Sequence, residues 1–198
     1  MEIEPFFAPD QYVTAEFTIR SYMPGDGPWL AEAVNASYEH LKRFMPWAKP
    51  HTEDVEAEQT VRRWRGEYLL ATNFTLGVFA PDGKRLLGSS GFHLREGELS
   101  NHAAEVGMWI RADAAHKGLG PRVLRAILTW GFSEWPWERL TWRCNEENVA
   151  SRRTAEKAGM QFEGRFRAAI LLPDGTRETT LAFAALKGEW GRGEGEMG

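Results

Sequence analysis

The segment from residue 104 to residue 144 restricts the fold of this chain more than any other part of the sequence. It begins with a strand-like stretch, AEVGMWI, and passes through a turn with two glycines, AHKGLG. The apolar spacing of an amphipathic helix follows in PRVLRAILTWGFSEW, and then a second strand-like stretch, RLTWRC. A strand, a helix and a strand in this order predict a crossover unit whose two strands pair in parallel.

The rest of the sequence predicts mainly antiparallel neighbours for this unit. Strand patterns cover residues 15–23, 73–80, 85–94, 160–172 and 177–186, with a hairpin turn at 81–83. Helical patterns cover 29–45, 51–70 and 148–159, with Thr52 and Asn148 as expected N-caps and Gly159 as the C-terminal glycine. We therefore predict an α/β (α+β) fold with a mixed, largely antiparallel central sheet flanked by helices. It should form one domain over residues 1–186, followed by a flexible tail over 187–198.

Composition excludes several classes of function. The chain of 198 residues has a formal net charge of −4, which does not suit a protein that binds nucleic acid through its phosphates. Its single cysteine, Cys144, cannot form an intrachain disulfide and is expected to be buried, and its five histidines lack metal-site spacing. Apolar runs of membrane-spanning length are absent and the first residues are acidic, so we expect no membrane partner, no signal peptide and a cytoplasmic location.

The turn AHKGLG has two interpretations. Its glycines can simply start a helix, or they can bring backbone amides to an anion, because the first amides of a helix lack intrahelical partners. Gly118 and Gly120 permit a close approach, and Lys117 and Arg122 add positive charge. Pro121 is expected as the first helical residue. The turn matches neither a P-loop nor a dinucleotide fingerprint, so the motif alone does not decide between the two.

Its context points to a family. AEVGMWI, AHKGLGPRVL and the later CNEENVASRRTAEKAGMQFEGRFR together resemble the GNAT superfamily of acetyl-coenzyme A-dependent N-acetyltransferases, especially its ribosomal-protein N-terminal (Rim-type) group. The pyrophosphate turn of that family reads Q/R-x-x-G-x-G/A, so the two glycines match and Ala115 replaces the first residue. The later signature of the group is met by Asn148, Ser151, Lys157, Gly159, Glu163 and Gly164, with Met160 in place of phenylalanine.

The resemblance implies a GNAT fold in which the strands before and after the crossover helix splay apart and hold the pantetheine arm. The cofactor-binding residues that it implies are Trp109, Ile110, Arg111, His116, Lys117, Gly118, Leu119, Gly120, Arg122, Asn148 and Ser151. Ser151 would also protonate the departing sulfur, and Glu105 would be the base that takes a proton from the amine. For Glu105, a solvated or ion-paired strand carboxylate is the alternative. Trp47, Phe92 and His93 are expected to bind the acceptor.

The implied reaction is direct transfer of an acetyl group from acetyl-coenzyme A to a primary amine, with a protein or peptide N-terminus as the first choice of acceptor. A small-molecule amine, such as a polyamine or an amino sugar, stays open. So does a non-catalytic sensor that binds acyl-coenzyme A, because Ala115 and the apolar surroundings of Ile170 depart from the pattern of the group. A homodimer also stays open.

Overall fold

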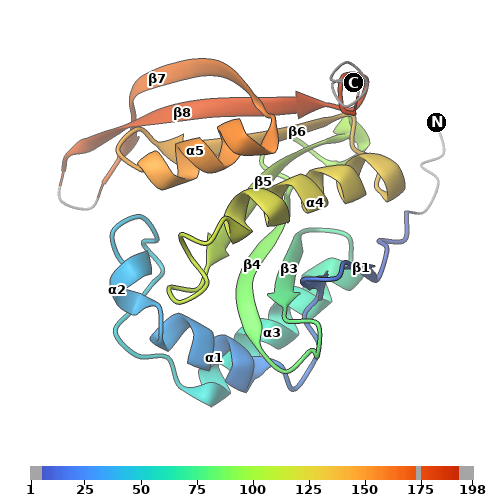
Figure 1. The fold of residues 1–198 in the computed structure, drawn as a ribbon, viewed down its shortest axis with the longest axis vertical. Coiled ribbons are helices and arrows are strands. Elements are labelled where there is room, and N and C mark those ends of the chain that lie inside the picture. The colour runs from blue at the N-terminus through green and yellow to red at the C-terminus, as the bar shows by residue number, and fades with distance from the viewer. Residues whose placement is uncertain (1–5, 173–174, 192–198) are drawn as a thin grey trace.

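In the computed structural model, which describes residues 6–172 and 175–191, one eight-stranded sheet runs through the molecule (Figure 1). Its strands are β1 (Gln11–Val13), β2 (Thr18–Ser21), β3 (Phe74–Phe79), β4 (Leu86–His93), β5 (Ala103–Ile110), β6 (Arg139–Asn145), β7 (Gln161–Leu171) and β8 (Arg177–Leu186). The order across the sheet is β1-β2-β3-β4-β5-β6-β8-β7. β5 and β6 pair in parallel, and the other described pairs are antiparallel, so the predicted fold class is confirmed.

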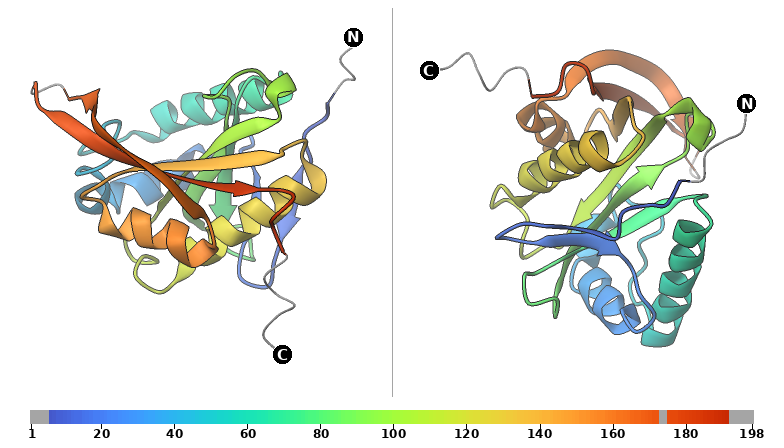
Figure 2. Two further views of the ribbon diagram at one scale, coloured as in Figure 1. Left: turned by 90° about the horizontal axis from the view of Figure 1, so that it is seen from above. Right: turned by 90° about the vertical axis from the view of Figure 1, so that its right-hand side faces the viewer.

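Helices cover both faces of this sheet (Figure 2). They are α1 (Gly27–Asn35), α2 (Tyr38–Leu41), α3 (Asp54–Leu69), α4 (Leu119–Glu134) and α5 (Val149–Ala158), with a short 3₁₀ turn at Leu99–Asn101. α4 and α5 lie on one face, where α4 buries an apolar stripe that includes Val123 and Ile127. The first three helices lie on the other face, where Leu30 and Val61 pack in a second core. No helix among residues 6–172 and 175–191 is long and apolar enough to cross a lipid bilayer.

Several predicted boundaries are wrong, and each has a local cause. The helix expected over 29–45 ends at Asn35, and the short helix α2 follows it within the expected range; the side chain of Asn35 accepts from the backbone N–H of Thr52 at 2.8 Å and donates to its carbonyl at 2.9 Å. Thr52 is not the N-cap of α3. The N-cap residue is Glu53, and the helix begins at Asp54. By contrast, Asn148 caps α5 as predicted, and Gly159 ends it with φ +93°.

The chain end after β8 is packed where it is described. Trp190, within the expected tail, packs its ring against Phe132 with a centroid separation of 5.8 Å. Its indole N–H donates to Thr129 at 3.2 Å. Residues 192–198, the remainder of the expected tail, lie outside the described residues.

Candidate active site

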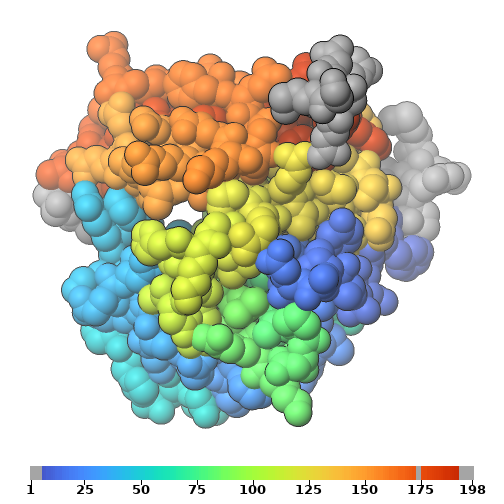
Figure 3. Space-filling model, in the orientation of Figure 1, coloured from blue at the N-terminus to red at the C-terminus, as the bar shows by residue number. Residues whose placement is uncertain are grey.

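β5 and β6 separate partway along their length. They pair only through residues 103–105 and 139–141, although β5 continues to Ile110 and β6 to Asn145. The gap opens into a cleft of about 1110 Å³, lined by residues from both faces of the sheet and from β7. In Figure 3 an opening is visible where the light-blue α2 region, the yellow-green loop before α4 and the orange C-terminal part meet. The predicted splay is therefore present and forms the floor of a large cleft.

The turn before α4 is built from backbone. Gly118 is the N-cap residue, with φ +74°, a left-handed conformation that glycine adopts without strain. α4 begins at Leu119, so Pro121 is its third residue and not its first as predicted. The amides of Gly118, Leu119 and Gly120 therefore lie among the first donors of the helix, which have no intrahelical partner, and Pro121 takes a position whose amide would have been unpaired.

Side chains around this turn are largely engaged elsewhere. Arg122 donates through Nε to Glu16 at 2.9 Å and through Nη1 to the carbonyl of Lys117 at 3.2 Å. His116, with φ +60°, places its ring edge-on to His40 at 6.0 Å between centroids. Arg122 is the fourth residue of α4, so its backbone amide has the carbonyl of Gly118 as its partner within the helix. The donors left for an anion are thus the backbone amides of the two glycines and of the leucine between them, with Lys117 exposed beside them.

The backbone groups of β5 that face the gap differ from those predicted. The amide of Arg111 donates to the carbonyl of Leu87 at 3.0 Å, so it points toward β4. The backbone N–H and C=O groups alternate in direction along a strand. Those of Trp109, two residues before Arg111, therefore also point toward β4. Met108 and Ile110 then turn their backbone groups toward the gap. Of the predicted set, the placement therefore supports Ile110, and the assignments of backbone contacts to Trp109 and Arg111 are wrong.

Arg111 has a structural contact set of its own. Its side chain is 4% exposed and donates to both carboxylate oxygens of Glu32 on α1, at 2.8 and 2.9 Å, and to Asp113 at 2.7 Å. These partners raise the pKa of the Arg111 guanidinium, and Arg111 in turn lowers the pKa of Asp113. The residue thus ties the first helix to the end of β5 and fixes one wall of the cleft.

Asn148 and Ser151 meet at the other wall, at the start of α5. Both line the cleft, and the carbonyl oxygen of the Asn148 side chain accepts from the Ser151 amide at 3.0 Å. The Ser151 hydroxyl accepts from the indole N–H of Trp142 at 3.1 Å, and it also lies within hydrogen-bonding reach of the Cys144 side chain. Cys144 lies nearby, only 7% exposed, and burial raises the pKa of its thiol, which disfavours a reactive thiolate.

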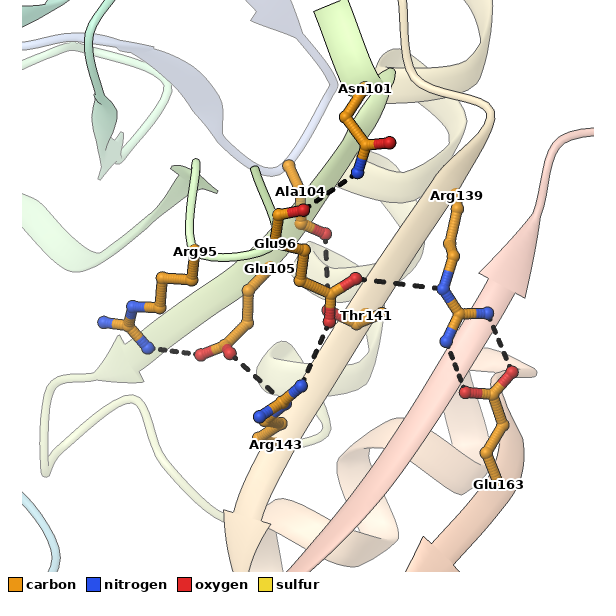
Figure 4. Close-up of polar contacts among 9 residues, drawn as sticks. All are labelled: Arg95, Glu96, Asn101, Ala104, Glu105, Arg139, Thr141, Arg143 and Glu163. Carbon is orange, nitrogen blue, oxygen red and sulfur yellow. Dashed lines mark hydrogen bonds and ion pairs between the residues drawn. The ribbon is translucent and has the colours of Figure 1, made fainter. Parts of the chain in front are cut away.

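Glu105 lines the cleft, and its carboxylate lies between Arg95 and Arg143 (Figure 4). Its carboxylate is 8% exposed; one oxygen pairs with Arg95, and the other lies 3.6 Å from Nε of Arg143. Arg143 also donates to Glu96 at 3.2 Å, and the Thr141 hydroxyl donates to the same carboxylate at 3.1 Å. Each oxygen of Glu105 therefore faces a guanidinium, and protonation of this carboxylate would weaken both ion pairs.

His93 lies opposite Glu105 in the register of β4 and β5. Its Nδ1 is 2.9 Å from the side-chain oxygen of Asn73, and its Nε2 lies over Gly107, where an added Cβ would come within 2.8 Å. Burial, with a smaller contribution from the charge of Arg95, lowers the pKa of His93 from 6.5 to about 4. The imidazole is thus neutral at pH 7, and its sequence-predicted place in the cleft is supported.

The other two residues predicted for the acceptor site, Trp47 and Phe92, lie in different places. Trp47 lines the cleft and packs its ring against Trp109 at 6.1 Å between centroids. Phe92 is fully buried on the opposite face of β4, against Trp135 and Trp137, so its assignment to the acceptor site is wrong.

The sequence did not predict four residues that line the cleft, because their approach to it depends on strand register that no local pattern encodes. They are Asn73, Arg95, Arg143 and Trp142. Among residues 6–172 and 175–191, no cluster of three or more His, Cys, Asp or Glu side chains could hold a metal ion.

Comparisons with known proteins agree with this geometry. YdaF of Bacillus subtilis (strain 168), named as a candidate ribosomal N-acetyltransferase, is 28% identical over 185 residues, covering 93% of this chain and 97% of YdaF. The solved structure of RimL, a ribosomal L7/L12 alpha-N-protein acetyltransferase in complex with coenzyme A, superposes with a TM-score of 0.78 at 20% identity, covering 88% of this chain and 96% of RimL. The microcin C7 self immunity acetyltransferase MccE, in complex with acetyl-CoA and AMP, has a TM-score of 0.78 at 16% identity, with 87% and 93% covered.

These two solved structures share the fold of this chain. In addition, a family model described as the acetyltransferase (GNAT) domain matches residues 16–161, which is most of the sequence. The chain therefore belongs to the GNAT family of acetyltransferases.

Proposed function

We propose that this protein transfers the acetyl group of acetyl-coenzyme A directly to a primary amine, and that the amine is the N-terminus of a protein or peptide. The observation that carries the proposal is the gap between β5 and β6, which begins after the pair Glu105–Thr141, continues to the end of β5 before the glycine turn, and opens into the cleft. A diphosphate fits the turn, because three unpaired amides there lie at the positive end of α4.

The pantetheine arm would run through the gap. The backbone groups of Met108 and Ile110 that face the gap are suited to pair with its amides, and a free N–H there would polarise the thioester carbonyl. Ser151, which lines the cleft, would supply a proton to the departing sulfur. The assignment of Glu105 as the base stays a prediction, and its two arginine partners weigh against it.

The acceptor would enter between the segment that follows α2 and the β7–β8 hairpin. The lining of the cleft there includes aromatic and apolar side chains such as Trp47, Met45 and Ile170, and Arg63 and Glu178 are among the charged residues of the cleft. The name of YdaF, a relative aligned over nearly the whole chain, supports a protein or peptide N-terminus as the acceptor.

The test combines binding and turnover. Calorimetry with acetyl-coenzyme A alone measures cofactor binding, and mass spectrometry of a peptide library with free N-termini, with spermidine and glucosamine as small amines, identifies the acceptor. We expect cofactor binding, thiol release that depends on a peptide, and acetylation of the peptide N-terminus. Acetylation of spermidine or glucosamine alone would replace the acceptor, and tight binding without transfer to any amine would show a sensor in place of an enzyme.

A further inference from the structure

The side chain of His93 is held so that one ring nitrogen is committed and the other is open to the cleft. Asn73 fixes the committed side. Its amide nitrogen donates to Glu67 and to Thr75, each at 3.2 Å, and this directs its oxygen toward His93. Because an amide oxygen only accepts, Nδ1 of His93 must carry the hydrogen, and Nε2 carries a lone pair.

Space for this lone pair exists because residue 107 is glycine. An added Cβ at Gly107 would lie 2.8 Å from Nε2 and 3.0 Å from Cδ2 of His93, so any other residue would displace the ring. Gly107 lies between Glu105 and Trp109 on the same face of β5, at the centre of the gap. Nε2 therefore stands above the part of β5 along which the thioester would lie.

We propose that Nε2 of His93 accepts the proton of the attacking amine, an inference that rests on the proposed acetyl transfer. The amine nitrogen forms a bond to the thioester carbon, and its N–H proton moves to Nε2. The C–S bond then breaks, and the electron pair leaves with the sulfur of coenzyme A. The thiolate takes the hydroxyl proton of Ser151, water returns a proton to Ser151, and His93 gives its proton to water, so the enzyme ends as it began.

The ion pairs of Glu105 favour His93 over Glu105 as the proton acceptor, although the charge of Arg95 opposes protonation of the imidazole. Arg95 and Glu105 face the imidazole from the segment after β4 and from β5, and Glu67 at the end of α3 acts through Asn73. Glu105 is paired with Arg95 and lies near Arg143, so its carboxylate is not a free proton acceptor in the resting cleft. The imidazole is neutral at pH 7, with its pKa lowered to about 4, so it takes the proton only after attack on the thioester carbon has made the amine nitrogen cationic.

The experiment measures single-turnover transfer from saturating acetyl-coenzyme A to the peptide that the wild-type protein acetylates fastest. His93→Gln should lower this rate about 100-fold or more, while calorimetry gives an unchanged affinity for acetyl-coenzyme A. His93→Gly should regain rate when free imidazole is added, a recovery that a merely structural role would not produce. His51→Gln changes an exposed histidine and should leave rate and affinity as in the wild type.

Glu105→Gln separates the two candidate bases and should lower the rate less than His93→Gln does. A nitrogen NMR spectrum of the unmodified protein at pH 7, assigned by difference from His93→Gln, should show Nδ1 of His93 protonated and Nε2 bare. A His93→Gln rate within threefold of wild type, a loss in His93→Gly that imidazole does not reverse, or a protonated Nε2 would each overturn the proposal. If the wild type binds no acetyl-coenzyme A or acetylates no amine, the proposed function fails first, and the NMR result still reports the tautomer.

Discussion

The two halves of the cleft present different chemical groups, backbone amides in one half and side chains in the other. On the side of α4 the useful groups are backbone amides at Gly118, Leu119 and Gly120, which come from one short stretch of sequence. On the side of β4 they are side chains, His93 and Glu105 above all, held by partners from several elements. From this comparison we expect the binding half to tolerate many side-chain changes, whereas the half that handles protons depends on register and on distant partners.

The largest expected effect separates neighbours on β4. Phe92 and His93 are adjacent, but Phe92 is buried in the core while His93 faces the cleft. Phe92→Ala should lower the free energy of unfolding by about 3–5 kcal/mol, because it removes a large side chain from a packed core. Urea unfolding measures this change. Transfer by the folded fraction should stay within a few-fold of wild type, and a selective loss of transfer with normal stability would return Phe92 to the acceptor site.

The burial of His93 should make the stability of the protein sensitive to acid. The folded-state pKa of His93, about 4, lies below the unfolded value of 6.5, so the fold favours the neutral imidazole. This stability is present above pH 6.5 and is lost as the pH falls from 6.5 to 4, by about 3 kcal/mol in all. Unfolding curves at pH 7 and pH 4.5 should therefore show a larger acid loss for wild type than for His93→Gln. Parallel losses in the two proteins would contradict the burial of a neutral imidazole.

Removal of the Ser151 hydroxyl tests the α5 wall. Ser151→Ala should lower the transfer rate about 100-fold, since an acid at the sulfur is lost, with little change in acetyl-coenzyme A affinity. Ser133→Ala, which removes a hydroxyl bound only to the carbonyl of Trp130 on α4, is the matched control. Stopped-flow detection of free thiol measures both. Equal rates for the two variants would mean that the sulfur leaves without help from Ser151.

The smallest effect concerns the backbone half. A Cβ at Gly120 would make only ordinary contacts, with Thr154 at 3.5 Å and Met108 at 3.9 Å, so packing does not require glycine there. Gly120→Ala should leave stability unchanged or raise it by up to about 1 kcal/mol, while the added methyl group keeps a diphosphate away and weakens acetyl-coenzyme A binding about tenfold. Gly66→Ala on α3, with open space around it, should raise stability similarly without affecting binding. Equal affinities for both variants would place the diphosphate elsewhere.

The sequence predicted the backbone half better than the side-chain half, for physical reasons. Helix starts, caps and strand–helix–strand order are local, so the turn at Gly118, the cap at Asn148 and the parallel pair were all accessible from spacing. The direction of a backbone amide along β5 depends on its partner strand, and this is why Arg111 was placed wrongly. The partners of His93 and Glu105 come from residues 10 to 38 positions away in sequence, and only the folded sheet brings them together.

The division between a binding half and a reacting half is tested most directly by one paired measurement. Acetyl-coenzyme A affinity and single-turnover rate at saturating cofactor are measured for wild type, Gly120→Ala and His93→Gln. Each variant should change one quantity only. Gly120→Ala should weaken the affinity and leave the rate of the bound enzyme unchanged, whereas His93→Gln should lower the rate and leave the affinity unchanged. If both variants change affinity and rate in the same proportion, the two halves of the cleft do not act separately and the account is wrong.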